Sequence, residues 1–297
     1  MPHTMRMTRR AGLRTAVAAG LALPLLATMP TSAAGPGNLR LSVMTFNLRF
    51  ASDSQPNSWP TRRPVMRRLL RREAPTILGT QEGLYQQLRD IHSDLGPLYA
   101  WIGTGREGGS RDESMAIFYD TRRLAPVEHD TYWLSDTPRV IGSNSWGGMF
   151  PRIVTWVRFR DLNAGGREVH VLNTHLDHAS QYARERGAQF IARKVADLGR
   201  SAPVVVTGDF NAAAHRNRAY DTLLAAGLED TWDTAAERSA LYATFHGYRP
   251  LTPGGDRIDW ILASSGTAVH RAGINTFAVE GQFPSDHLPV QASLTLP

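Results

Sequence analysis

The sequence predicts an α/β protein in which buried strands deliver polar side chains from their carboxyl ends. Three valines at 204–206 indicate a strand buried on both faces, and this strand runs directly into Thr207-Gly208-Asp209-Phe210-Asn211. The order strand, helix, strand occurs twice, over residues 43–82 and 171–209. Strand ends of this kind usually form the site of an α/β sheet. Asp and Asn are also common turn residues, so this stretch alone leaves a plain turn as the alternative.

The composition limits which class of protein the chain can be and which catalytic chemistry it can carry out. A chain of 297 residues allows one large domain or two small ones. Hydrophobic residues make up 42% and charged residues 20%, which is ordinary for a globular protein with a substantial core. The absence of cysteine excludes disulfides, a thiolate nucleophile and a thiolate metal site.

The first 34 residues have the pattern of a secretory signal peptide. Four arginines within residues 6–14 precede the short apolar run Ala16–Ala27, and small residues follow at 31–34. The run is too short to span a membrane, although an uncleaved anchor is the alternative. Cleavage near Ala34 removes four arginines and no acid, which reduces the net charge of +6 to +2. We therefore expect a secreted domain at residues 35–297, with no stable membrane anchor after cleavage and with a net charge that says little about a polyanionic partner.

Strand and helix patterns alternate along the rest of the chain. Apolar residues at a period of two indicate strands, and apolar residues at helical spacing indicate helices. The expected strands are Leu39–Val43, Thr76–Glu82, Glu113–Tyr119, Thr131–Leu134, Ile153–Phe159, Glu168–Asp177, Val204–Asp209, Arg257–Leu262 and Gln291–Leu296. The expected helices are Arg62–Arg72, Gly83–Leu95, Gln181–Leu198 and Arg218–Ala226. Two sheets packed back to back would bring the ends of the two strand–helix–strand units together.

Two segments have both a functional and a structural interpretation. One face of the helix at 62–72 holds Arg62, Arg63, Arg67, Arg68, Arg71 and Arg72. This face could bind phosphate, but we favour a solvated surface because no aromatic residues interleave. The loop at 135–151 holds Trp146, Met149 and Phe150, which could contact a substrate or plug the loop onto the core. We favour the plug.

Six short motifs then identify the family that the chain resembles. They are Thr45-Phe46-Asn47, Gln81-Glu82, Asn173-Thr174-His175, Gly208-Asp209-Phe210-Asn211, Arg257-Ile258-Asp259 and Ser285-Asp286-His287. In this order they closely resemble the endonuclease/exonuclease/phosphatase superfamily, over residues 39–297. The resemblance implies a four-layer α/β/β/α sandwich of two packed mixed sheets, and a metal-dependent phosphoric ester hydrolase with its site at one edge of the sandwich.

The resemblance also implies a metal site. Glu82 matches the main ligand of Mg²⁺, with Mn²⁺ as a substitute, and Asn47 lies beside it. Asp286 matches a further carboxylate of the metal site. Oxygen donors of this kind suit a hard cation that also relies on substrate phosphate.

The matched positions further imply a catalytic set. His287 matches either the general base or a stabiliser of the phosphate, and Asp259 matches the carboxylate that orients it. Asp209 matches the group that positions or deprotonates the attacking water, and Asn211 matches a donor to the phosphate. His287 beside Asp286 is a common arrangement, since imidazole titrates near neutral pH.

Two further residues match family positions that contact the substrate phosphate or support such a contact. His175 matches a second phosphate-contacting or acid histidine, and Glu113 matches its carboxylate partner in deoxyribonuclease-like members. Arg152 is expected to contact phosphate. Three histidines have no matching role: His178, His215 and His246.

We expect hydrolysis of phosphodiesters rather than phosphomonoesters, by a monomer, with nucleic acid among the candidate partners. The basis is the histidine pair, His175 and His287, because two imidazoles can serve the incoming water and the leaving oxygen separately. The alternatives are a phosphomonoesterase, a sphingomyelinase-type phospholipid hydrolase and a non-catalytic binding protein on the same scaffold. The sequence does not identify the substrate.

Overall fold

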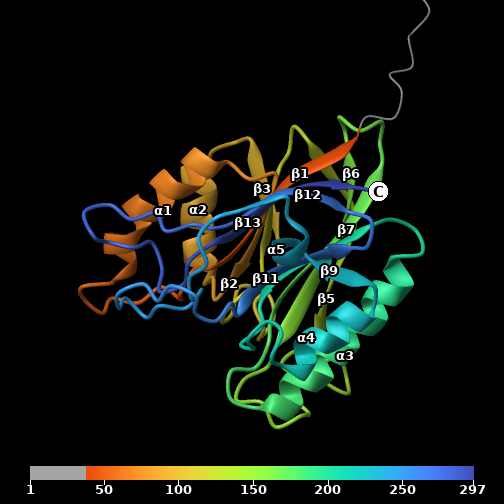
Figure 1. The fold of residues 1–297 in the computed structure, drawn as a ribbon. Coiled ribbons are helices and arrows are strands. Elements are labelled where there is room, and N and C mark those ends of the chain that lie inside the picture. The colour runs from red at the N-terminus through yellow and green to blue at the C-terminus, as the bar shows by residue number, and fades with distance from the viewer. Residues whose placement is uncertain (1–37) are drawn as a thin grey trace, which may run out of the picture. The chain divides into compact units, whose positions relative to one another are not determined.

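The computed structural model describes residues 38–297, which build two mixed sheets (Figure 1). The expected signal peptide at 1–34 lies outside the described residues. The first sheet has the order β10-β12-β13-β1-β2-β4-β3, and the second has the order β5-β6-β7-β8-β11-β9. The strands of the first sheet are β1 (Leu39–Asn47), β2 (Ile77–Gln81), β3 (Tyr99–Ile102), β4 (Ile117–Asp120), β10 (Glu237–Arg238), β12 (Ala268–Ile274) and β13 (Val290–Leu296). Those of the second are β5 (Leu124–Trp133), β6 (Ile153–Asp161), β7 (Glu168–His175), β8 (Val204–Asp209), β9 (Leu228–Asp230) and β11 (Asp259–Ser264).

Helices cover the outer face of each sheet, which gives the four layers α/β/β/α. They are α1 (Trp59–Glu73), α2 (Tyr85–Leu95), α3 (Gln181–Leu198) and α4 (Arg218–Ala225). The short α5 (Thr231–Thr234) instead contacts strands of both sheets and places Trp232 in the apolar cluster between them. The pair α1 and α2 packs on the first sheet through one apolar cluster, and α3 and α4 pack on the second through another (Figure 1). None of the helices in the described part of the chain is both long and apolar enough to cross a membrane.

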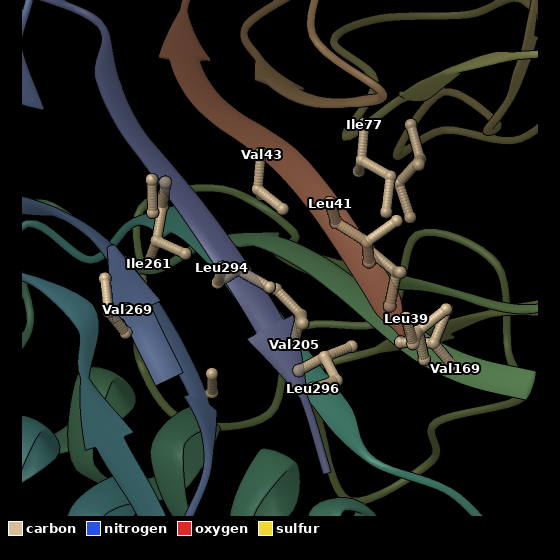
Figure 2. Close-up of a cluster of buried hydrophobic side chains, with 14 of the residues drawn as sticks. Leu39, Leu41, Val43, Ile77, Val169, Val205, Ile261, Val269, Leu294 and Leu296 are labelled. Carbon is tan, nitrogen blue, oxygen red and sulfur yellow. The ribbon is translucent and has the colours of Figure 1, made fainter. Parts of the chain in front are cut away.

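The largest apolar cluster lies between the two sheets. Its side chains come from the inward faces of both sheets and are almost fully buried (Figure 2). Burial of apolar surface at about 25 cal/mol per Å² is the main favourable term in folding, so this layer holds the sheets together. Figure 2 labels Leu39, Leu41, Val43, Ile77, Val169, Val205, Ile261, Val269, Leu294 and Leu296.

A polar contact inside this layer sets how closely the sheets approach at their centre. Asn173 Oδ1 accepts from Gln81 Nε2 at 2.7 Å and from Thr207 Oγ1 at 3.0 Å, while its Nδ2 donates to the carbonyl of Thr80 at 2.8 Å. A Cβ at Gly79 would lie 2.2 Å from Thr207 Oγ1. Only glycine leaves room for this contact between sheets.

The two expected strand–helix–strand units are present as parallel pairs. Strand β1 pairs with β2 in parallel, and β7 pairs with β8 in parallel. In the second pair His175 lies opposite Asp209, and Asp259 lies opposite Asp209 from the antiparallel strand β11. Three site residues therefore come from three neighbouring strand ends.

Several expected elements differ from the structure. Helix α1 begins at Trp59 rather than Arg62, because the Ser58 hydroxyl caps it by accepting from the amide of Thr61. The strand expected at 131–134 is the end of the longer β5, and β3, β9, β10 and β12 were not predicted. The middle of β5 is exposed on an edge strand, so it lacks the apolar alternation that marks a half-buried strand.

The arginine face of α1 is not one solvated surface. Arg62 is 0% exposed, which contradicts the favoured interpretation for this residue. Arg63 pairs with Asp90 and Asp94 of α2, whereas Arg67 and Arg68 remain exposed. In the loop at 135–151, Trp146 is buried as a plug, but Met149 and Phe150 are exposed. The plug interpretation is confirmed for the tryptophan alone.

Candidate active site

A pocket of about 300 Å³ opens where strands of both sheets end. The two sheets contribute to it through the segments that follow β1, β2, β7 and β8 and the segment that precedes β13. Its lining residues are Phe50, Glu82, Arg106, Glu113, Phe150, Arg152, His175, His178, Asp209, Asn211, Phe245, Ile258, Asp286 and His287. Eight of the ten site residues expected from the sequence are among them; the other two, Asn47 and Asp259, contact lining residues directly.

At the centre of the site, the side-chain amide of Asn47 bridges two carboxylates, one from each sheet. Asn47 Nδ2 donates to Glu82 Oε1 and to Asp209 Oδ2, both at 2.9 Å. Glu82 has a left-handed backbone (φ +61°), and its Oε2 accepts from the amide of Phe50 at 3.1 Å. One side-chain oxygen or nitrogen from each of Glu82, His175 and Asp209 lies within 4.8 Å of the others. This group provides two carboxylates at the mouth of the pocket, a donor set that fits a hard divalent cation.

The expected ligands occupy different positions around this centre. Asn47 presents its nitrogen to the carboxylates, because its Oδ1 accepts from the amide of Arg49 at 2.9 Å. It is therefore oriented as a donor between Glu82 and Asp209 and not as an oxygen ligand. Asp286 lines the pocket wall 3.9 Å from Arg49 Nε and belongs to none of the clusters of candidate ligands in residues 38–297. Glu82 is the expected ligand that the structure places at the centre, and Asp209 joins it.

His287 and Asp259 form the expected pair. His287 Nδ1 lies 3.0 Å from Asp259 Oδ2, and Nε2 lies 3.8 Å from Asp209 Oδ2. Burial would lower the pKa of His287, but the charges of Asp259 and Asp209 outweigh it and raise this pKa to about 10. Burial, together with the charge of Asp259, raises the pKa of Asp209 to about 7. The neighbouring acidic groups thus favour the charged form of His287, which fits a phosphate stabiliser better than a base.

His175 has different partners from those expected. Its Nε2 lies 2.9 Å from Asn211 Nδ2 and 3.4 Å from Asp209 Oδ2, and its Nδ1 has no hydrogen-bond partner in the described part of the chain. Glu113, the expected partner, accepts instead from Arg106 Nη1 at 3.0 Å. Burial, followed by the charge of Arg152, holds the pKa of His175 well below its usual value. His175 is therefore neutral at pH 7, and the expected His–Glu pair is absent among residues 38–297.

Asn211 contributes to this arrangement through its backbone and its side chain. Its backbone is left-handed (φ +48°), and its amide donates to Asp209 Oδ1 at 2.9 Å. Its Nδ2 donates to the carbonyl of Leu176 at 3.0 Å and contacts His175. Asn211 thus orients both Asp209 and His175 while it lines the pocket.

Arg152 lines the same pocket and has donors without hydrogen-bond partners. It is 7% exposed, and neither Nε nor Nη1 has a hydrogen-bond partner among the residues described. Its Nη2 contacts His178 Nδ1 at 2.9 Å, and Nε is 3.7 Å from Asp177 Oδ2. Buried donors without acceptors are costly, so an anion in the pocket would satisfy them. This geometry agrees with the expected phosphate contact.

Of several further residues in the pocket wall and at its rim, the sequence had named only Phe150, as one that could contact a substrate or plug the loop. Arg106 is buried, pairs with Asp112 and Glu113 at 3.0 Å, and lies 4.6 Å from the centre of the Phe150 ring. Three phenylalanines at the mouth are between 41% and 46% exposed: Phe50, Phe150 and Phe245. All of these residues lie on loops, where no periodic pattern reveals them.

The remaining histidines are distributed around the site. His178 joins the pocket wall, where it stacks on Phe150 as well as contacting Arg152. His246 Nε2 lies 3.1 Å from the carbonyl of Ser285. His215 lies near Asp230 and Asp233, but Arg257 already pairs with Asp230 at 2.8 Å. Because the guanidinium of Arg257 already pairs with Asp230, we do not assign this acidic group as a metal site.

The fold and these motifs define a class of protein. The model of the Endonuclease/Exonuclease/phosphatase family matches residues 44–287, so the chain belongs to this family. Members of the superfamily hydrolyse phosphate esters, generally with a divalent metal ion, and the cluster around Glu82 provides suitable ligands here. No curated protein matches the sequence.

Solved structures include similar proteins. The mannosyl-6-phosphatase Bt3783 of Bacteroides thetaiotaomicron VPI-5482 is 35% identical with a TM-score of 0.80, over 86% of this chain and 99% of that chain. An endonuclease/exonuclease/phosphatase from Bacteroides vulgatus is 31% identical with a TM-score of 0.81, over 87% and 99% of the two chains. The catalytic domain of human Nocturnin, 17% identical with a TM-score of 0.68 over 88% and 96%, shares the fold.

Proposed function

We propose that the protein is a Mg²⁺-dependent phosphatase that removes phosphate from small phosphomonoesters, with sugar phosphates as the first candidates. The observation that carries the proposal is the lining of the pocket, which combines the guanidinium of Arg152 with His287, Glu82 and Asp209. A phosphate in this pocket would meet both hydrogen-bond donors and the metal-binding carboxylates.

Each side chain has a role in this proposal. Mg²⁺, when bound at Glu82, would neutralise phosphate charge and stabilise the leaving oxygen. Arg152 and the His287 imidazolium donate hydrogen bonds to phosphate oxygens, which stabilises the charge of the transition state. Asp209 positions the attacking water and accepts its proton. Asn211 orients Asp209, and Asp259 orients His287.

Two observations support a small monoester. The pocket volume of about 300 Å³ is at the lower end for small-molecule sites, and three exposed phenylalanines surround its mouth. The mannosyl-6-phosphatase, which is 35% identical, acts on a phosphorylated sugar according to its name. A phosphodiesterase, with a nuclease among its forms, is the second candidate, because both His175 and His287 line the pocket. The pairing of Glu113 with Arg106 weakens that candidate, since His175 lacks the expected carboxylate.

One substrate panel tests the proposal. Purified mature protein with Mg²⁺ or Mn²⁺ would be given mannose 6-phosphate, glucose 6-phosphate, inositol phosphates, p-nitrophenyl phosphate, bis-p-nitrophenyl phosphate, sphingomyelin, single-stranded RNA and plasmid DNA. We expect release of inorganic phosphate from sugar phosphates and none in EDTA. Cleavage of the diesters with no release from any monoester would establish the second candidate instead. Inactivity on the whole panel, with metal binding retained, would favour a binding protein.

We propose as well that the chain is exported by a signal peptide at residues 1–34. The support is the charged, apolar and small-residue pattern of this segment. N-terminal sequencing of protein from culture supernatant should begin close to Ala34 or Gly35. Retention of all the protein in cells with Met1 intact would refute export.

A further inference from the structure

Arg62 is a buried cation surrounded by neutral acceptors. It lies on α1, is 0% exposed, and donates hydrogen bonds to backbone carbonyls alone among the described residues. Its partners, at distances between 2.7 and 3.2 Å, are the carbonyls of Leu48, Arg49, Phe50, Asn57 and Pro284. Burial lowers the pKa of this guanidinium. Because an uncompensated buried charge is costly, only this full set of charge-assisted hydrogen bonds makes the position tolerable.

Three of these acceptors, the carbonyls of Leu48, Arg49 and Phe50, belong to the turn at 48–50 that follows β1. Two backbone amides of the same turn donate to side chains at the centre of the site. The amide of Arg49 donates to Asn47 Oδ1 at 2.9 Å, and the amide of Phe50 donates to Glu82 Oε2 at 3.1 Å. Arg49 also has a left-handed backbone (φ +50°), which is unfavourable without support. The carbonyls of residues 48–50 therefore face Arg62, while the amides of Arg49 and Phe50 face the site.

The acceptor at Pro284 connects the same guanidinium to the other side of the site. The next residue, Ser285, donates through its hydroxyl to the carbonyl of Asn47 at 2.7 Å. The same hydroxyl accepts from the amide of His287 at 3.2 Å. Arg62 Nη1 thus joins the carbonyl of Leu48 to that of Pro284, and so couples the β1 turn to the segment that carries His287.

We propose that Arg62 is a positioning residue of the active site: it fixes the turn at 48–50 and the segment at 284–287 relative to each other. This proposal rests on the proposed function for its effect on catalysis. A lysine is a point charge with three donors, so it cannot reproduce the five hydrogen bonds of the planar fork. Displacement of a catalytic group by about 1 Å lowers rates on the order of 10²-fold.

The experiment compares Arg62→Lys and Arg62→Met with two controls. Arg68→Gln removes an exposed arginine of the same helix, and Leu223→Ala removes a buried side chain of α4, which packs on the other sheet. Amide hydrogen exchange is followed in EDTA without substrate, well below each melting temperature. Activity and the half-saturating Mg²⁺ concentration are then measured on the same preparations.

We expect faster exchange in segments 48–50 and 285–287 of both Arg62 variants, a kcat lowered on the order of 10²-fold and a higher half-saturating Mg²⁺ concentration. Both controls should match the wild type in these segments and in kcat, although Leu223→Ala melts earlier. Equal exchange and equal kcat in Arg62→Lys and Leu223→Ala would overturn the proposal, because a stabilising role alone predicts that result.

A measurement on the wild type covers the case in which the Arg62 variants do not fold. The Nε–H of Arg62 donates to the carbonyl of Asn57 at 3.0 Å, so its NMR signal should exchange slowly with solvent in metal-free protein. Fast exchange of this proton would also overturn the proposal. Neither exchange measurement depends on turnover. They therefore test the positioning role of Arg62 even if the protein hydrolyses none of the substrates in the panel.

Discussion

Substitution of Glu113 by glutamine should stabilise the metal-free protein at alkaline pH. The side chain of Glu113 is 15% exposed, and burial, reinforced by Glu82, raises its pKa from 4.5 to about 7 despite the opposing charges of Arg106 and Arg152. A raised pKa means that the fold favours the protonated form. Its contribution to stability is therefore fully present below the unfolded pKa of 4.5 and is lost as the pH rises through about 7. Glutamine is a neutral isostere that cannot ionise.

The size of the effect follows from the shift in pKa. A change from 4.5 to about 7 corresponds to a total of about 3 kcal/mol, most of which is lost between pH 5 and pH 8. Urea unfolding in EDTA, at steps of half a pH unit, would measure the difference in the free energy of unfolding between Glu113→Gln and the wild type. Other titrating groups are common to both proteins and cancel in this difference.

The expected result is that Glu113→Gln gains about 2 kcal/mol on the wild type from pH 5 to pH 8. A variant that is less stable than the wild type at pH 8 would refute the reasoning. That outcome would mean that the ion pair with Arg106, 3.0 Å long, outweighs the burial of the charge. Equal slopes of unfolding free energy against denaturant are needed for the comparison.

Three further predictions concern the core and the chemistry. Glu82→Gln should lower kcat on the order of 10²-fold or more and weaken Mg²⁺ binding with little change in melting temperature; isothermal calorimetry and steady-state kinetics test this. Asp259→Asn should lower the pKa of His287 and kcat together, on the order of 10²-fold, and an unchanged pH–rate profile would contradict the pairing. Gly79→Ala should destabilise the protein by about 2 kcal/mol or more in denaturant unfolding, because its Cβ would lie 2.2 Å from Thr207 Oγ1; wild-type stability would contradict the close approach.

The sequence was sufficient for the fold and for the centre of the site. The valines of β8 and the two parallel strand–helix–strand units follow from local patterns, and both are present. Residues at strand ends could be located because a strand end fixes where a side chain emerges. Glu82, His175 and Asp209 come together for this reason.

Side-chain pairing across loops could not be predicted in the same way. Glu113 was expected to support His175, yet it meets Arg106, which comes from the preceding loop. Six arginines at helical spacing are equivalent in a sequence pattern. The carbonyls of residues 48–50, Asn57 and Pro284, which accept from Arg62, distinguish it from the exposed Arg68.

Residues at strand ends form the centre of the site, whereas residues on loops form the mouth of the pocket. This division affects how the substrate range can change. Site groups at strand ends, such as Asp209, emerge from a core in which Asn173 joins one sheet to the other, so their spacing tolerates little alteration. Among the phenylalanines at the mouth, Phe150 lies on the loop at 135–151, whereas Phe50 belongs to the segment that Arg62 holds and the ring of Phe245 lies 5.0 Å from that of His287. Exchange of Phe150 for smaller or polar residues would therefore admit other leaving groups with the least effect on Glu82 and His287. A library centred on position 150 is thus a compact route to new specificities on this scaffold.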